Sequence, residues 1–441
     1  MDQTALERQI DTEVKARFPA GAVQGVTLLR HGGDPDELLV RVFIGAEDGP
    51  ADHQRSLDEW AKAHQTGMRR LRRELSLRLP EASMLEFTID APGATARITM
   101  PDDPALTSEP LPAREIVETA TGLLRTHYVF PGEAGEAAAA IEASLGAGEY
   151  DGLDEDALAE RLTTQLQEAC HDKHLQVGTV SPQPDGQQRA VRRQRPERRR
   201  WERRPHNFGI YRVEWLDGNV GYLDLRGVAD PGEAGPAIAA AMELVSGTDA
   251  LIIDLRRNHG GSPHGVVFWC SYFFAAGGTH LNDILHAGTG ETRQFWSMAY
   301  VPGSRYLDRP VYLLSSAETF SGGEDFCYSM QAQGRAEVIG ETTGGGAHPT
   351  RTIPISATIA ISVPFARSVN PVTGTNWQGT GVVPDIAVPA ARACDVAYRK
   401  ALEHVLSIGV PPPIAAEARD ALAALPPADA APADAAPANE A

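Results

Sequence analysis

The sequence contains little cysteine: its 441 residues include only Cys170, Cys270, Cys327 and Cys394. These four lie far apart and form neither a CxxC pair nor the Cys/His spacing of a zinc site. They do not indicate a disulfide scaffold either, so we interpret them as small apolar core residues. We expect neither a metal site nor a cofactor.

Long apolar runs are also missing, since no stretch approaches the roughly 18 residues of a membrane-spanning helix. The first eight residues, Met1–Arg8, lack the basic and apolar regions of a secretory signal. Basic residues are outnumbered, and the formal net charge of -19 disfavours nucleic acid as the main partner. These absences predict a cytoplasmic protein with no membrane or nucleic-acid partner.

The part of the chain before residue 181 is predicted to contain two units. Residues 1–110 have the pattern of a small α/β domain, with strands near 26–29, 38–44, 85–89 and 96–100 and a helix over 57–75. We find no chemistry in this domain, which favours packing, recognition or dimerisation and makes it the candidate surface for a homo-oligomer. Residues 111–180 are predicted to be helical, with Asp154 capping the third helix.

The rest of the chain is predicted to consist of a linker, a core and a tail. Residues 181–206 form an Arg-rich linker, for which a solvated loop is favoured over a nucleic-acid patch. Residues 207–410 alternate strands with helices, which predicts an α/β core. Within it we expect one strand over 352–363. Residues 411–441 are rich in Ala and Pro and are predicted to be a disordered tail.

A serine at a predicted helix start is the first candidate for chemistry, in the segment 319–326, TFSGGEDF. Ser321 follows a buried strand, and the unpaired N–H groups at a helix start can bind developing negative charge. The local pattern alone favours a simpler role, in which Ser321 is an N-cap and Glu324 completes a capping box.

Three glycine-rich segments accompany this serine. Residues 254–263, DLRRNHGGSP, lead from a core strand to a helix and can present an N–H to an oxyanion or cradle a phosphate. Their spacing fits neither common nucleotide-binding fingerprint. Residues 340–349 read GETTGGGAHP, and residues 370–386 read NPVTGTNWQGTGVVPDI. Alone, these last two segments are loops.

Together and in this order, the four segments resemble the serine peptidase family that contains the tail-specific (C-terminal-processing) proteases, the tricorn core protease and interphotoreceptor retinoid-binding protein. The resemblance covers roughly residues 113–405 and is closest to the retinoid-binding-protein-like branch. It implies a crotonase-like α/β spiral domain, preceded by the helical region and the small N-terminal α/β domain.

The resemblance also implies roles for individual residues. Ser321 falls on the nucleophile, and the N–H of Gly322, with that of Gly260 or Gly261, falls on the oxyanion hole. The processing proteases place a base lysine in the segment matching 344–346, which contains no lysine here. The tricorn-like arrangement uses a histidine that matches His174, and its steadying glutamate aligns with Gln378. His348 is the rival base.

The function implied is a serine peptidase that cleaves peptides or unfolded protein chains through an acyl-enzyme. A hydrophobic-ligand-binding module with weak or no catalysis is the first alternative, because one fold supports several functions. An acyl hydrolase or transferase acting on a small metabolite is the second. The Ser321 and His174 pair favours an enzyme, whereas the amide of Gln378 favours the binding module.

Overall fold

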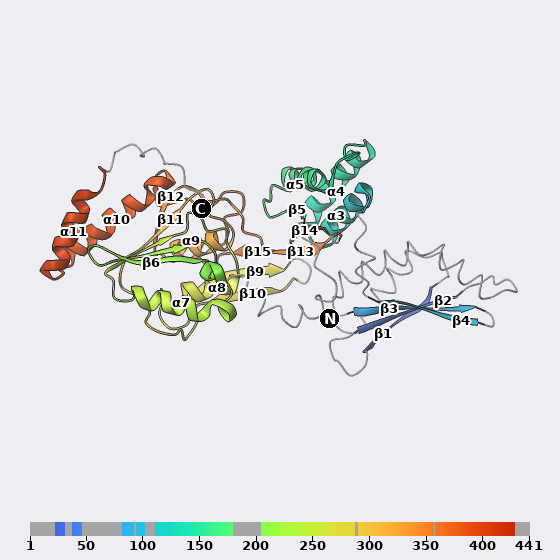
Figure 1. Cartoon of the computed structure of the whole chain (residues 1–441), viewed down its shortest axis with the longest axis horizontal. Helices are drawn as coiled ribbons and strands as arrows, with labels where there is room; N and C mark the ends of the chain where they lie inside the picture. Colours follow the sequence, from blue (N-terminus) through green and yellow to red (C-terminus); the bar gives the residue numbers. More distant parts are fainter. Residues whose placement is uncertain are drawn as a thin grey trace. The chain divides into compact units, whose positions relative to one another are not determined.

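The computed structural model describes residues 23–30, 38–45, 82–91, 94–101, 111–179, 204–286, 290–356 and 358–427 (Figure 1). The chain divides into two compact units, and each is described by itself. The helix predicted over 57–75, nearly all of the Arg-rich linker and the end of the chain from residue 428 lie outside the described residues.

The first unit contains a four-stranded sheet whose strands follow sequence order: β1 (Val23–Arg30), β2 (Leu38–Gly45), β3 (Ala82–Ala91) and β4 (Ala94–Pro101). β1 pairs antiparallel with β2, β2 parallel with β3, and β3 antiparallel with β4. All four strands predicted in this region are confirmed.

The second unit begins with the predicted helical region, α3 (Ala113–His127), α4 (Pro131–Gly146) and α5 (Glu155–Cys170). Asp154 caps α5, as predicted, by accepting a hydrogen bond from the Ala157 N–H at 2.9 Å. The helix ends at His171, which has the left-handed conformation (φ 50°) that commonly terminates helices. The chain then reaches the short strand β5 (Gln176–Thr179).

A six-stranded sheet forms the centre of the second unit, in the order β16-β12-β11-β8-β7-β6. Its strands are β6 (Ile210–Leu216), β7 (Val220–Leu225), β8 (Ala250–Asp254), β11 (Val311–Ser315), β12 (Glu337–Gly340) and β16 (Ile386–Ala387). Only β6 runs antiparallel to its neighbour, and the other pairings are parallel. The α/β class predicted for this region is confirmed, with the helical region before it.

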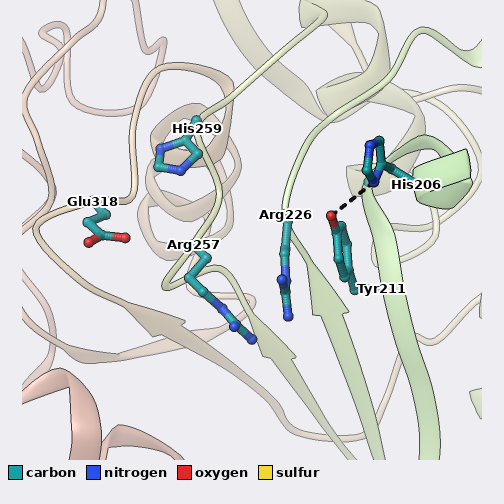
Figure 2. Close-up of a pocket in the computed structure, with 7 residues that line it drawn as sticks. His206, Tyr211, Arg226, Arg257, His259 and Glu318 are labelled. Carbon is teal, nitrogen blue, oxygen red and sulfur yellow. Dashed lines mark hydrogen bonds between the residues drawn. The ribbon is translucent and has the colours of Figure 1, made fainter. Parts of the chain in front are cut away.

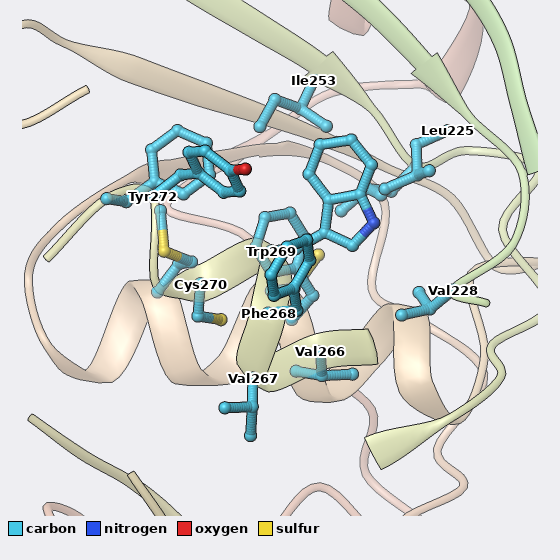
Figure 3. Packing of buried hydrophobic residues seen from close by; sticks show 14 of the residues in the cluster. Leu225, Val228, Ile253, Val266, Val267, Phe268, Trp269, Cys270 and Tyr272 are labelled. Atoms are coloured by element: carbon cyan, nitrogen blue, oxygen red, sulfur yellow. The ribbon is translucent and has the colours of Figure 1, made fainter. Parts of the chain in front are cut away.

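Both faces of this sheet are covered, because alternate residues of a strand point to opposite faces. Leu251 and Ile253 of β8 pack in one core with α7 (Pro231–Val245), α8 (Pro263–Cys270) and α9 (Gly322–Ala332). Figure 3 shows Trp269 of α8 lying in this core near Leu225 and Ile253. Ile252 packs on the other face with α10 (Ala390–Ser407) and α11 (Pro412–Ala424). Nearly continuous burial is typical of parallel strands between two helix layers.

The described residues also form two three-stranded sheets. One has the order β10-β9-β15, with β9 (His280–His286), β10 (Thr292–Trp296) and β15 (Ala366–Val369). The other has the order β13-β14-β5, with β13 (Thr350–Pro354) and β14 (Ile359–Pro364). The single strand predicted over 352–363 is therefore two strands, because the chain turns between them, where the N–H of Ile355 and of Ser356 both donate to the Ile359 carbonyl.

The disordered tail predicted from residue 411 is wrong for its first part, since Pro412–Ala424 form the helix α11. Ala418 is fully buried, and Ile414, Ala421 and Leu422 pack against the same core. Their spacing puts them on one face of a helix, a pattern that the Ala- and Pro-rich composition obscures. Three of the four cysteines, Cys170, Cys270 and Cys327, are buried and unpaired, which confirms their interpretation as core residues. None of the described helices is long and apolar enough to span a membrane.

Candidate active site

Ser321 occupies a strained turn between β11 and α9. Its torsions, φ 53° and ψ -118°, lie where residues other than glycine are rarely found. Glu324 completes the predicted capping box, but an ordinary N-cap residue is extended. Ser262, at the start of α8, shows that ordinary conformation, with φ -77° and ψ 130°. Capping alone therefore does not account for the backbone of Ser321.

The Glu324 carboxylate joins the Ser321 turn to the glycine-rich loop at 344–346. One oxygen accepts from the N–H of Ser321 and of Gly346, both at 2.8 Å. The other accepts from the Gly345 N–H at 2.6 Å and from the Thr343 hydroxyl at 2.5 Å. The side chain is fully buried, and burial raises the pKa of this carboxyl although the four donors counteract the shift. The sequence motif gave Glu324 only the capping role.

The loop at 258–261 lies directly against Ser321. A Cβ added at Gly260, where φ is 94°, would lie 2.8 Å from the Ser321 Cβ, so only glycine fits there. The Gly260 N–H donates to the Asn258 side chain at 2.9 Å and is therefore occupied. The N–H groups of Gly261 and Gly322 have no acceptor among the described residues. Of the two alternatives for the oxyanion hole, this geometry favours Gly261 over Gly260.

Hydrogen bonds hold these two loops together. The Phe320 N–H donates to the Asn258 carbonyl at 2.9 Å, and the Thr319 hydroxyl donates to the Leu255 carbonyl at 2.8 Å. Both loops follow neighbouring parallel strands, β8 and β11, so they meet at the carboxyl edge of the sheet. Ligand sites of α/β sheets lie at this edge.

His174 reaches this site from the segment between α5 and β5. Its ring lies 4.6 Å from the ring of Phe320, the residue before Ser321. A Cβ at Gly346 would lie 2.6 Å from the His174 Cε1 and 2.3 Å from the Phe320 ring. No side chain can therefore stand at position 346, and His174 occupies the space beside that loop.

Asp172, which the sequence analysis did not assign, is the carboxylate beside His174. Its Oδ1 accepts from the His174 backbone N–H at 3.0 Å and lies 3.7 Å from the Nδ1 of the ring. That Nδ1 is buried and makes no hydrogen bond with any described group. Burial opposes ionisation of Asp172, but its hydrogen bonds with His174 and His348 outweigh burial and hold its pKa well below the ordinary value. Asp172 is therefore a buried carboxylate anion.

His348 lies on the other oxygen of the same carboxylate. Its Nδ1 is 2.6 Å from the Asp172 Oδ2, and its ring meets Phe130 edge to face with centroids 5.4 Å apart. The Tyr128 hydroxyl also donates to this oxygen, at 3.4 Å. Only 4% of the His348 side chain is exposed. Asp172 thus joins the two candidate bases, one on each oxygen.

Gln378, which the resemblance matches to the glutamate that steadies the histidine, makes its hydrogen bonds to the backbone. Its Oε1 accepts from the Ala347 N–H at 2.8 Å, and its Nε2 is 3.5 Å from the His171 carbonyl. Both ends of the amide are used by the backbone, and the described residues show no hydrogen bond between Gln378 and the imidazole. A sequence signal for the true partner was present, because Asp172 stands two residues before His174.

Among the side chains that the structure describes, no three from His, Cys, Asp and Glu are grouped as metal ligands are. The chemistry available at the site is that of a hydroxyl, an imidazole, a buried carboxylate and two free N–H groups. This combination is suited to acyl transfer.

Comparison with protein families gives two matches. Residues 219–388 match the model of peptidase family S41, and residues 111–201 match the N-terminal domain that this family has in eukaryotic IRBP. The first match includes Ser321, Gly261 and His348, and the second includes Asp172 and His174.

Three solved structures that are similar to this chain share little sequence with it. A lipoprotein from Streptococcus agalactiae is 11% identical with a TM-score of 0.43, covering 66% of this chain and 96% of that one. The photosystem II D1 C-terminal processing protease is 13% identical with a TM-score of 0.39, covering 64% and 94%. The tricorn protease is 14% identical with a TM-score of 0.39, covering 74% and 38%.

Proposed function

Because this chain belongs to peptidase family S41 and is a serine-type peptidase, we propose that it cleaves peptides or unfolded protein chains through an acyl-enzyme on Ser321, with His174 as the base. One observation supports this assignment above the others. Ser321 is held in a strained conformation between two free N–H groups, and an imidazole backed by a buried carboxylate lies beside the same turn.

In the first step, the Ser321 hydroxyl oxygen attacks the carbonyl carbon of the scissile bond. The hydroxyl proton passes to Nε2 of His174, because Nδ1 faces Asp172 and carries the other proton. The N–H groups of Gly261 and Gly322 receive the negative charge that develops on the carbonyl oxygen. The intermediate then collapses, the amine leaves with the proton from His174, and the acyl group stays on Ser321.

In the second step, water replaces the amine. His174 takes a proton from the water, the hydroxide attacks the acyl carbon, and Ser321 leaves with the proton. The Asp172 carboxylate stabilises the imidazolium that forms in both steps, and the 3.7 Å separation shortens to a hydrogen bond as charge develops. A hydrogen bond that tightens only in the transition state raises kcat more than it lowers KM.

The proposal that His174 acts as base, and not His348, follows from what each ring touches. His174 packs on Phe320 and Gly346, which both adjoin the Ser321 turn. The Nδ1 of His348 instead donates to the Asp172 carboxylate, and the ring packs on Phe130. We assign His348 a positioning role, in which it holds the carboxylate that faces His174.

The binding-module alternative loses its main support in this geometry. It rested on Gln378 standing where a carboxylate should assist the histidine, and Asp172 supplies that carboxylate. A metabolite hydrolase would use the same nucleophile and base, so it differs from the peptidase only in what the surrounding surface binds.

The test is labelling with a fluorophosphonate probe, which reports an activated serine without a known substrate. The parent should be labelled and should hydrolyse an unfolded protein such as casein, and Ser321→Ala should do neither. Ser262→Ala is the matched control, because Ser262 also begins a helix but has ordinary torsions; it should remain labelled. Labelling of Ser321→Ala at the parent's rate would overturn the assignment.

A further inference from the structure

A pocket of about 410 Å³ whose lining includes several charged side chains lies beside the candidate active site (Figure 2). Its walls come from five places in the chain: the short helix η2 (Arg204–Gly209), the start of β6, and the segments after β7, β8 and β11. The lining residues are His206, Gly209, Tyr211, Arg226, Arg257, His259 and Glu318. Three of these segments follow parallel strands, so the pocket is at the carboxyl edge of the sheet, as Ser321 is.

The pocket shares its loops with the proposed catalytic groups. His259 directly precedes Gly260 and Gly261, and Glu318 stands three residues before Ser321. The segment after β7 is tied to the same loop, since the Val228 N–H donates to the Gly260 carbonyl at 2.9 Å. A peptide whose carbonyl oxygen is bound at Gly261 therefore places a neighbouring residue within reach of the pocket.

Two guanidinium groups dominate the wall that Figure 2 shows between His259 and Tyr211. Arg226 and Arg257 both donate to the Oδ2 of Asp224 at 2.9 Å. Because this single buried carboxylate is shared, one positive charge remains. Arg226 is further fixed by stacking over the Tyr211 ring at 3.7 Å.

Arg257 is the cation that is free to bind a ligand. Its side chain is 52% exposed, and only its Nη2 has an acceptor among the described residues. A guanidinium carries five N–H donors, so Nε and Nη1 can still receive a carboxylate in a bidentate contact. His259 and His206 add donors on either side, and the Tyr211 hydroxyl lies 3.2 Å from the His206 Nδ1.

Glu318 is the acidic residue of the pocket lining, and it has no ion-pair partner among the described residues. Figure 2 shows it on the side of His259 away from Arg226. A carboxylate in the pocket would therefore be attracted by Arg257 and repelled by Glu318. Removing Arg257 should therefore weaken carboxylate binding, and removing Glu318 should strengthen it. A purely structural role for either residue would not give these opposite effects.

We propose that this pocket is a substrate subsite that binds a carboxylate of the peptide, with Arg257 attracting it and Glu318 limiting the affinity. This inference rests on the proposed peptidase function. The carboxylate is either an acidic side chain near the scissile bond or the free carboxyl end of the chain. Both present the same group to Arg257, and the experiment separates them.

The experiment measures peptide binding without turnover, by fluorescence anisotropy in the Ser321→Ala protein at low salt. Three labelled alanine pentapeptides are compared: one blocked with a central Glu, one blocked with a central Gln, and the Gln peptide with a free carboxyl end. Arg257→Gln and Glu318→Gln are made in the same background. Arg399→Gln is the control, since Arg399 is partly exposed on α10 and its side chain donates to the Pro426 carbonyl.

At least one carboxylate peptide should bind about tenfold more tightly than the blocked Gln peptide. That ratio should fall to near one in Arg257→Gln, rise in Glu318→Gln and stay constant in Arg399→Gln. Which peptide shows the ratio identifies the side-chain or terminal source. Three results would overturn the inference. The first is an affinity ratio near one in the Ser321→Ala protein, and the second is no detectable binding of either carboxylate peptide. The third is an unchanged ratio when Arg257→Gln is added. Hydrolysis that persists in Ser321→Ala would overturn the proposed function instead.

Discussion

The Asp172→Asn substitution tests the proposed catalytic arrangement most directly. It removes the negative charge beside His174 while keeping an oxygen that can accept the His174 backbone N–H, now at 3.0 Å. The amide has nearly the same shape, so the segment between α5 and β5 should stay in place. The variant therefore separates charge stabilisation from simple positioning.

The size of the effect follows from the 3.7 Å between the Asp172 Oδ1 and the His174 Nδ1. Two unit charges about 4 Å apart interact by about 4 kcal/mol at an effective dielectric constant of about 20. His348 occupies the other oxygen of the carboxylate, so part of that interaction is already shared. If half of the interaction, about 2 kcal/mol, is available to stabilise the His174 imidazolium, its removal lowers kcat about 30-fold. If all of it is available, kcat falls about 1000-fold.

Steady-state kinetics on an unfolded protein or a fluorogenic peptide measures this loss, which should appear in kcat with KM nearly constant. Asp325→Asn is the matched control, because Asp325 is also a buried carboxylate but contacts Ser329 and Asn282. A fall of less than threefold in kcat, while Ser321 still labels, would show that Asp172 does not stabilise the base.

The stability of Asp172→Asn should also depend on pH in one direction. The folded-state pKa of Asp172 lies below its unfolded value of about 4. Its ionised form therefore stabilises the parent above about pH 4, and this contribution is lost as the pH falls below that value. Denaturant unfolding should show that the free energy of unfolding of the variant is lower than that of the parent. This difference should be constant above pH 5 and should shrink in acid. A difference that grows in acid contradicts the assignment.

Three further outcomes are expected. His174→Ala should lose about 10²–10⁴ in kcat and His348→Ala less, because only His174 exchanges the proton; kinetics with the reverse ranking would move the base to His348. Glu324→Gln should lower stability by about 3 kcal/mol and slow labelling of Ser321, because an amide leaves two of the four donors without an acceptor; unchanged unfolding would refute this. Burial raises the pKa of Asp325 to about 6. The protonated side chain therefore stabilises the folded protein fully below about pH 4, and this contribution is lost as the pH rises through about 6. Asp325→Asn should therefore abolish that dependence, and unfolding midpoints at pH 4 and pH 7 that shift as in the parent would contradict it.

The sequence predicted the strands and helices well where periodicity and caps agreed. Asp154 marked the start of α5, and the buried run at 250–254 marked a central strand. It failed at α11, because buried small residues such as Ala418 carry little hydrophobic signal. It also merged β13 and β14, since the alternation continues across the bend and outweighed the turn signals of Pro354 and Ser356.

The site could be predicted in its parts but not in its pairing. The resemblance to a serine peptidase family, and not the local patterns, pointed to Ser321, His174 and Gly261, whose catalytic roles are proposals. Which carboxylate faces His174 depends on how the chain leaves α5, where the left-handed His171 redirects the backbone. An alignment position pointed to Gln378, whereas this local turn brings Asp172 there. Contacts made by folding over long sequence separations, such as Asp172 with His348, carry no local signature.

The position of the base has a consequence for how the site is assembled. A lysine in the 344–346 loop would belong to the same segment that Glu324 ties to Ser321. Here that loop has no room for a side chain, and both His174 and Asp172 come from the helical region instead. Catalysis therefore requires that this region stay docked, and Lys173, between the two, supplies a contact by donating to the Gly344 carbonyl at 2.7 Å. Because the proposed nucleophile, Ser321, and the proposed base, His174, lie about 150 residues apart in sequence, we expect partial opening between their segments to abolish activity before the core unfolds.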